Sequence, residues 1–235
     1  RRRGTARHVI VPRARAAARA GRPVHSLASR LFALYLSALL PLAAAAQTAP
    51  VEGVDYARID GGRPWQAEPG TIEVVEVFAY TCGHCDQFQP MLDAWKRKAA
   101  KDVRLRLLPA AYDPGDALAR GFFAAESLGR LGQVHAALFD AIHRSYALPA
   151  HGTSIGEVRD FLAGQGLDAG KVQAAMTSPA TDAKMNAARE FAVRSGIRST
   201  PTLIINGKYR VQGRSLQDSL RIADALVAAE RAASR

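Results

Sequence analysis

The sequence predicts an α/β domain into which a set of helices is inserted, and three observations carry this prediction. An apolar, β-branched strand at 72–80 leads into a helix whose start holds both cysteines of the chain. A second strand at 103–108 completes a strand–helix–strand unit. After an alanine-rich stretch with helical spacing at 116–195, strand character returns in a hairpin at 202–211.

The leading residues carry the pattern of an export signal. Residues 26–46 combine a basic flank at Arg30, a short apolar core and small residues that end in alanines at 44–46. We therefore expect a signal peptide at 26–46, with an uncleaved anchor as the alternative. Residues 1–25 are rich in Arg and Ala, and we expect a basic extension outside the mature protein. The alternatives are an organelle-targeting peptide and a nucleic-acid-binding arm.

The basic charge of the chain lies mostly in these leading residues. The formal net charge is +11, from 32 Lys and Arg and 21 Asp and Glu. Residues 1–46 hold nine of the arginines and no acid, so the rest has 23 basic and 21 acidic residues and a net charge of +2. The charge therefore gives no reason to expect nucleic acid as a partner. Export itself implies an oxidising compartment, in which disulfides persist.

The first elements of the remaining chain follow from their composition. Alternating residues at 54–59 predict a first strand, which Gly and Pro at 61–64 end. The strand at 72–80 is nearly continuous in apolar character, so we expect it to be buried on both faces. The helix after it carries an apolar stripe made of Phe88, Met91, Leu92 and Trp95.

The later elements are predicted from their boundary residues. About four helices are expected within 116–195, one of them beginning at a capping-box pattern of Ser154 and Glu157. Asn206-Gly207 lies between two short apolar runs and is a strong signal of a tight hairpin. A final helix is expected from Ser215.

The two cysteines are spaced as a C-x-x-C motif, Cys82 to Cys85, and the chain has no others. Thr81 offers an N-cap-like hydroxyl, so the N–H groups and the positive end of the helix dipole point at Cys82 and favour its thiolate. Cys85, one turn further in, is expected to be shielded. Cys82 is then the attacking sulfur and Cys85 the resolving one.

Metal or haem binding by this motif is not supported by its spacing. A zinc ribbon needs a second ligand pair, which the chain lacks. A c-type haem site needs His directly after the second cysteine, where Asp86 stands. We expect no metal and no cofactor beyond the redox-active disulfide Cys82–Cys85, and an inert buried pair is the alternative. The other histidines show no metal spacing and are expected to be solvated: His135, His143 and His151.

Glu76 is an acid in the middle of the apolar strand. If both faces of the strand are covered, Glu76 is buried, and it then needs a raised pKa or a partner. Arg104 or Arg106 on the next strand could pair with it. The alternative is an exposed Glu at a sheet edge.

Three segments together resemble the DsbA family of thiol:disulfide interchange proteins, within the thioredoxin superfamily. They are Phe-Ala-Tyr-Thr-Cys-Gly-His-Cys at 78–85, Ser-Thr-Pro-Thr at 199–202 and Ile-Asn-Gly-Lys-Tyr at 205–209. The resemblance covers roughly residues 52 to 232. It implies a thioredoxin fold with an inserted α-helical domain. Its two parts would be residues 47–114 and 196–235, around an insert at 115–195.

The resemblance also implies roles for single residues. The Thr200–Pro201 bond would be cis and lie against the cysteine pair, where the Thr200 backbone pairs with an extended substrate; an ordinary trans turn proline is the alternative. His84 would stabilise the Cys82 thiolate, with a solvated loop residue as the alternative. Glu76 falls at the position of a buried acid that assists proton transfer at the resolving cysteine.

The implied function is that of a thiol:disulfide oxidoreductase that introduces disulfide bonds into exported proteins. It implies a periplasmic monomer that acts on reduced, folding chains and is reoxidised by a DsbB-type, quinone-linked membrane partner. Gly83-His84 and Thr200 instead resemble isomerase patterns. A disulfide isomerase or reductase is therefore the alternative, and a peptide-binding chaperone on the same fold is a third.

Overall fold

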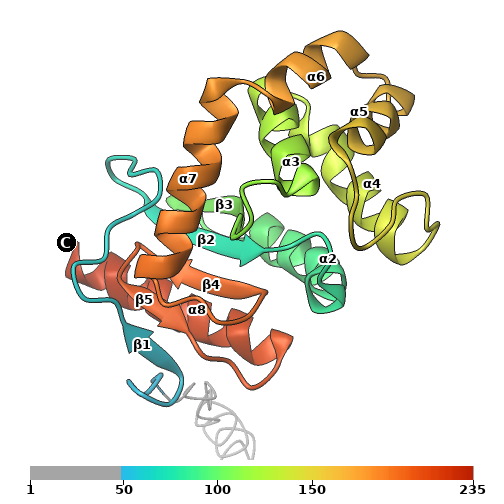
Figure 1. The fold of residues 1–235 in the computed structure, drawn as a ribbon. Helices are drawn as coiled ribbons and strands as arrows, with labels where there is room; N and C mark the ends of the chain where they lie inside the picture. Colours follow the sequence, from blue (N-terminus) through green and yellow to red (C-terminus); the bar gives the residue numbers. More distant parts are fainter. Residues whose placement is uncertain (1–48, 235) are drawn as a thin grey trace, which may run out of the picture. The chain divides into compact units, whose positions relative to one another are not determined.

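A five-stranded mixed sheet organises residues 49–234, the part of the chain that the computed structural model describes (Figure 1). The strand order is β1-β5-β4-β2-β3. Only the β2–β3 pair is parallel among these described strands; the other pairs are antiparallel. The strand bounds are Tyr56–Arg58 (β1), Ile72–Phe78 (β2), Val103–Pro109 (β3), Thr202–Ile205 (β4) and Tyr209–Val211 (β5).

Strand β2 is buried along its whole length because helices cover both faces of the sheet. Ile72 and Val74 pack against one layer, and Val75 and Val77 face a second core, as the period of two in a strand requires. The first layer is formed by α2 (Gly83–Lys98) and α8 (Leu216–Ala233). The prediction of a strand with two buried faces is confirmed.

The connection between β3 and β4 is helical, as predicted. Five helices fill it within the described residues, and we call them the helical insert (Figure 1). Their bounds are Ala117–Ser127 (α3), Leu131–His143 (α4), Ile155–Gly164 (α5), Ala169–Met176 (α6) and Pro179–Arg194 (α7). The count exceeds the expected four because the stretch between Gly129 and Gly164 holds two helices. The predicted capping box starts the second of them, with Ser154 and Glu157 bonded reciprocally.

The hairpin that returns to the sheet has the predicted tight turn. Asn206 and Gly207 both have positive φ, 50° and 67°, which a two-residue turn of type I′ requires. A Cβ at Gly207 would lie 2.1 Å from the Arg63 carbonyl oxygen, so no side chain fits there. The final helix begins after its predicted cap, because the Ser215 side chain accepts from the Asp218 N–H.

Two of the predicted segments, the basic extension at 1–25 and the signal peptide at 26–46, lie outside the described residues. Within residues 49–234, no helix combines the length and apolar character that crossing a bilayer requires.

Candidate functional site

The cysteine pair lies where β2 leads into α2. Cys82 is the N-cap of α2, with extended backbone, and its Sγ accepts a hydrogen bond from the Cys85 N–H at 3.4 Å. The predicted capping role of Thr81 is wrong, because the sulfur of Cys82 occupies the capping position. Cys82 is half-buried and Cys85 is fully buried. A thiol from another protein can therefore reach the first sulfur and not the second.

The two thiols differ strongly in acidity. A hydrogen bond from the Cys85 thiol lowers the pKa of Cys82 to about 5, and the backbone N–H groups of Cys85 and His84 act in the same direction. The same sulfur–sulfur contact, with burial, raises the pKa of Cys85. The reduced pair at neutral pH is then a thiolate at Cys82 and a thiol at Cys85. The His84 side chain is exposed, so this residue supports the thiolate through its backbone.

The loop before β4 faces Cys82 from the other side. The Thr200–Pro201 peptide bond is cis, as the resemblance implied. The Thr200 carbonyl oxygen lies 3.2 Å from Cys82 Sγ and accepts a hydrogen bond from it when the thiol is protonated. Thr200 and Pro201 are half-buried, so one side of this loop stays open beside the sulfur.

Glu76 lies fully buried in β2, on the face that α2 covers. Burial raises the pKa of Glu76 to about 8, and hydrogen bonds from Gln89 oppose that rise. The Gln89 Nε2 donates to both carboxylate oxygens, at 3.2 and 3.1 Å. Gln89 follows Cys85 by one helical turn, so Glu76 lies beneath the same face of α2 as Cys85.

The predicted pairing of Glu76 with Arg104 or Arg106 is wrong. The parallel register places Glu76 opposite Leu107, so both arginines point to the other face of β3. Both are ion-paired with Glu68 instead, with the Arg106 contact at 3.6 Å.

The expectation that His135 is solvated is also wrong. Its ring is buried among Phe78, Phe122 and Phe139. Both ring nitrogens have partners: Nδ1 lies 2.8 Å from the Tyr80 hydroxyl and Nε2 lies 3.0 Å from the Gln89 side-chain oxygen. Burial lowers the pKa of His135 to about 4, so the ring is neutral at physiological pH.

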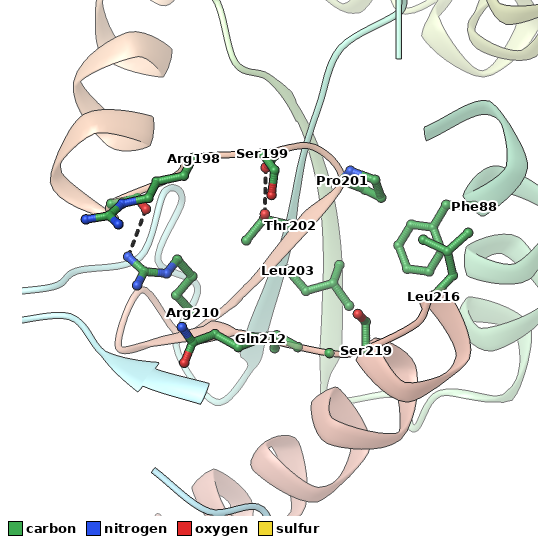
Figure 2. A pocket seen from close by; sticks show the side chains of 13 residues that line it. Phe88, Arg198, Ser199, Pro201, Thr202, Leu203, Arg210, Gln212, Leu216 and Ser219 are labelled. Carbon is green, nitrogen blue, oxygen red and sulfur yellow. Dashed lines mark hydrogen bonds between the residues drawn. The ribbon is translucent and has the colours of Figure 1, made fainter. Parts of the chain in front are cut away.

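A groove of about 330 Å³ opens beside the cis proline (Figure 2). Phe88 from α2 and Leu216 from α8 face each other at the end near Pro201. Arg210 lies toward the other end, where its guanidinium donates to the Ser195 and Gly196 carbonyl oxygens. The groove thus has an apolar pair at the end near Pro201 and Arg210 toward the other end.

The chemistry of the site resides in its sulfurs. Within residues 49–234, no three His, Cys, Asp or Glu side chains gather as metal ligands would. The arrangement of an accessible thiolate, a buried thiol and a buried carboxyl suits the exchange of a disulfide and the proton that accompanies it.

Comparison with known proteins gives one consistent family. Residues 68–224 match the family model described as Thioredoxin. The thiol:disulfide interchange protein DsbA of Pseudomonas aeruginosa is 35% identical over 187 residues, covering 78% of this chain and 87% of that protein. The same-named protein of Azotobacter vinelandii is 37% identical over 174 residues, with 71% and 78% covered.

Solved structures agree with these relatives. The crystal structure of the oxidoreductase DsbA from Xylella fastidiosa is 41% identical, covers 78% of this chain and 99% of that one, and superposes with a TM-score of 0.76. The P. aeruginosa DsbA structure gives 34% identity and a TM-score of 0.72, with 79% and 96% covered. The predicted thioredoxin fold with inserted helices is confirmed.

Two site residues escaped the sequence-based prediction. Gln89 follows Cys85 by four residues, and this helical spacing was the signal that could have placed it beside Glu76. His135 belongs to a helix far along the chain, and its contact with Gln89 arises only in the folded protein.

Proposed function

The chain belongs to the DsbA family of thiol:disulfide interchange proteins, and we propose that its Cys82 and Cys85 carry out the exchange in the order that their exposure dictates. The protein is a thiol:disulfide oxidoreductase that introduces disulfide bonds. Half-exposed Cys82, beside the open loop at Thr200, meets the substrate, while buried Cys85 stays within the protein.

The exchange begins with the oxidised pair. A substrate thiolate attacks Cys82 Sγ, and the bond between Cys82 and Cys85 breaks. Cys85 leaves as a thiolate and takes up a proton, for which the Glu76 carboxyl is the nearby source. A second substrate thiolate then attacks the substrate sulfur of the mixed disulfide. Cys82 leaves as a thiolate, so the substrate gains a disulfide and the pair gains two electrons.

The direction of transfer follows from the stability of the leaving group. A thiolate with a pKa of about 5 leaves readily and is stabilised by the start of α2. The same interactions stabilise the reduced pair over the disulfide, which makes the disulfide a stronger oxidant. This low pKa of Cys82, at the accessible sulfur of a DsbA-family chain, favours an oxidase over the isomerase, reductase and chaperone alternatives.

The cis-proline loop and the groove beside it would hold the substrate. An extended segment could run along the open side of Thr200 and Pro201 and place an apolar side chain between Phe88 and Leu216. Backbone pairing accepts many sequences, which suits an enzyme that acts on reduced, folding chains.

The export pattern at 26–46 supports a periplasmic location, where the protein would act as a monomer on exported proteins. The electrons that it collects must leave again. A DsbB-type membrane partner that passes them to quinone would restore the disulfide.

A disulfide-transfer assay tests this proposal. Oxidised protein is mixed with a reduced, unfolded secreted ribonuclease, and recovery of ribonuclease activity and loss of free thiols are followed. We expect one substrate disulfide per Cys pair and no transfer by Cys82→Ser. When Cys85→Ser is first converted to its Cys82–thionitrobenzoate mixed disulfide, a substrate thiolate should displace thionitrobenzoate and leave a trapped mixed disulfide with the substrate. Undiminished transfer by Cys82→Ser would overturn the assignment.

A further inference from the structure

A continuous set of buried and half-buried hydrogen bonds joins the helical insert to the carboxyl group beneath the active-site helix. Tyr80 contacts His135, His135 contacts Gln89, and Gln89 contacts Glu76. The distances between heavy atoms in these contacts run from 2.8 to 3.2 Å. Three elements contribute to the set: β2 and its end, α2, and α4 of the insert.

The partners fix the direction of each bond. The Gln89 Nε2 donates to both oxygens of Glu76, an arrangement that suits the ionised carboxylate, so the amide oxygen points away from Glu76. That oxygen needs a donor, which is His135 Nε2. Because the ring is neutral, Nδ1 must then accept, and the Tyr80 hydroxyl donates to it. Every polar atom in the set has a partner of the right kind.

We infer that His135, on the helical insert, is a positioning residue for proton transfer at Cys85, because it holds the Gln89 amide with its N–H groups toward Glu76. The inference rests on the proposed role of Glu76. Without a donor at position 135 the amide can turn over, and its oxygen would then face the carboxylate. The insert thereby influences chemistry at a cysteine that it does not carry.

The surroundings of His135 argue against a role as core filler alone. Its ring is packed among three phenylalanines, and an apolar side chain would fill such a cage without bringing a polar atom of its own into it. A neutral imidazole is tolerated there because both nitrogens are bonded. A Phe at this position would instead leave the Gln89 oxygen, a half-buried acceptor, without this donor.

Other charged groups face this set and bear on its titration. Cys82 and Asp93 act on Glu76, and both raise its pKa. A cavity of about 350 Å³ borders His135, and the charged side chains that share its lining are Asp93, Lys96, Arg106 and Glu126. Since a substitution at 135 leaves all of them in place, the change in the amide's orientation is the main effect of such a variant.

The test follows the Glu76 carboxyl directly, by NMR titration of the ¹³C-labelled carboxyl carbon in the reduced full chain. We expect the wild-type carboxyl to titrate near 8 and His135→Phe to move the midpoint upward by about one pH unit, a tenfold change in the ionised fraction. His135→Gln keeps an N–H donor near the Nε2 position and should return the midpoint to the wild-type value. His135→Met replaces the Phe variant if that variant does not fold.

A matched control separates positioning from packing. His143 lies in the same helix and donates to the Tyr80 backbone carbonyl at 2.7 Å, whereas the Gln89 amide is bonded by His135. His143→Phe should leave the Glu76 midpoint unchanged. The inference is overturned if His135→Phe leaves the Glu76 midpoint unchanged. It is also overturned if His143→Phe and His135→Gln shift that midpoint as far as His135→Phe does.

A kinetic comparison in two backgrounds distinguishes this inference from the role on which it rests. His135→Phe should shift the pH profile of Cys85-dependent disulfide formation by as much as it shifts the Glu76 midpoint. When His135→Phe is added to Glu76→Gln, the profile should not change further. If Glu76→Gln shifts the profile and His135→Phe does not, only the inference about His135 fails. If Glu76→Gln leaves the profile unchanged, the relay through Glu76 fails and the inference with it.

Discussion

Cys82 Sγ lies 3.2 Å from the carbonyl oxygen of Thr200, although 118 residues separate them in the chain. The strand–helix unit supplies the sulfur, and the loop that follows the helical insert supplies the carbonyl. The site therefore exists only when both parts of the sheet are assembled around the insert. This relationship explains why one half-exposed sulfur is presented beside an open stretch of backbone.

Alkylation should distinguish the two cysteines. At pH 6 the reduced protein should react with iodoacetamide at Cys82 first, because its thiolate is populated above a pKa of about 5 while Cys85 is buried with a raised pKa. Peptide mass analysis after partial labelling measures the order. Adducts that form first on Cys85 would reverse the assigned roles.

The stability of the reduced protein should depend on pH through Cys82. Its pKa falls from 9.0 to about 5 on folding, so the thiolate contributes stability that is fully present above 9 and is lost as pH falls through 5. Between these pH values the free energy of unfolding rises with pH by at most about 1.4 kcal/mol per pH unit. Solvent screening at the half-exposed sulfur reduces this slope.

Urea unfolding of the reduced and oxidised forms between pH 4 and pH 8 checks this expectation. The stability advantage of the reduced form should shrink toward acid pH, because the oxidised form has no thiolate to lose. An equal pH dependence in both forms would contradict a depressed Cys82 pKa.

Glu76→Gln should raise stability most at alkaline pH. The folded-state pKa of about 8 exceeds the ordinary value of 4.5, so the wild-type protein loses stability as pH rises between those values. Removing the ionisable group removes that loss. We expect the advantage of the variant to be about 1–3 kcal/mol larger at pH 8 than at pH 4, measured by chemical denaturation.

The same variant should slow the chemistry at Cys85 and change its pH dependence. A buried acid on the opposite face of β2 provides the control: Glu73 accepts from the Trp65 and Gln66 N–H groups, away from the cysteines. Glu73→Gln should lower stability and leave the pH profile of disulfide formation as it is. Identical profiles for wild type and Glu76→Gln would remove the proton-transfer role.

The capping box of α5 should affect stability alone. Ser154→Ala removes the acceptor for the Glu157 N–H at the start of that helix and should cost about 1 kcal/mol. Disulfide transfer per folded molecule should stay unchanged, because α5 supplies no residue to the site. Thermal unfolding and the ribonuclease assay together measure both quantities.

Local signals explain which elements were predictable. The buried strand, the Asn206-Gly207 turn and the capping box at Ser154 are each specified by neighbouring residues, and each was found as expected. The expected difference in exposure between the two cysteines followed in the same way from their place at the start of a helix.

Contacts between distant elements were not predictable in this way. The partner of Glu76 depends on the register of β2 against β3, which places Leu107 opposite and turns the arginines away. His135 is polar by residue type, and its burial follows only from how α4 meets α2 and the end of β2. A single sequence does not specify such registers and docking positions, because they depend on the whole packed core.

The redox equilibrium of the Cys82–Cys85 pair with glutathione tests the central claim most directly. Mass analysis of acid-quenched mixtures gives the fraction oxidised at each ratio of reduced to oxidised glutathione. A Cys82 thiolate stabilised as the structure describes predicts a potential more oxidising than about −180 mV, the value of protein disulfide isomerase. A potential near or below about −270 mV, that of thioredoxin, would make the protein a reductant and contradict the account.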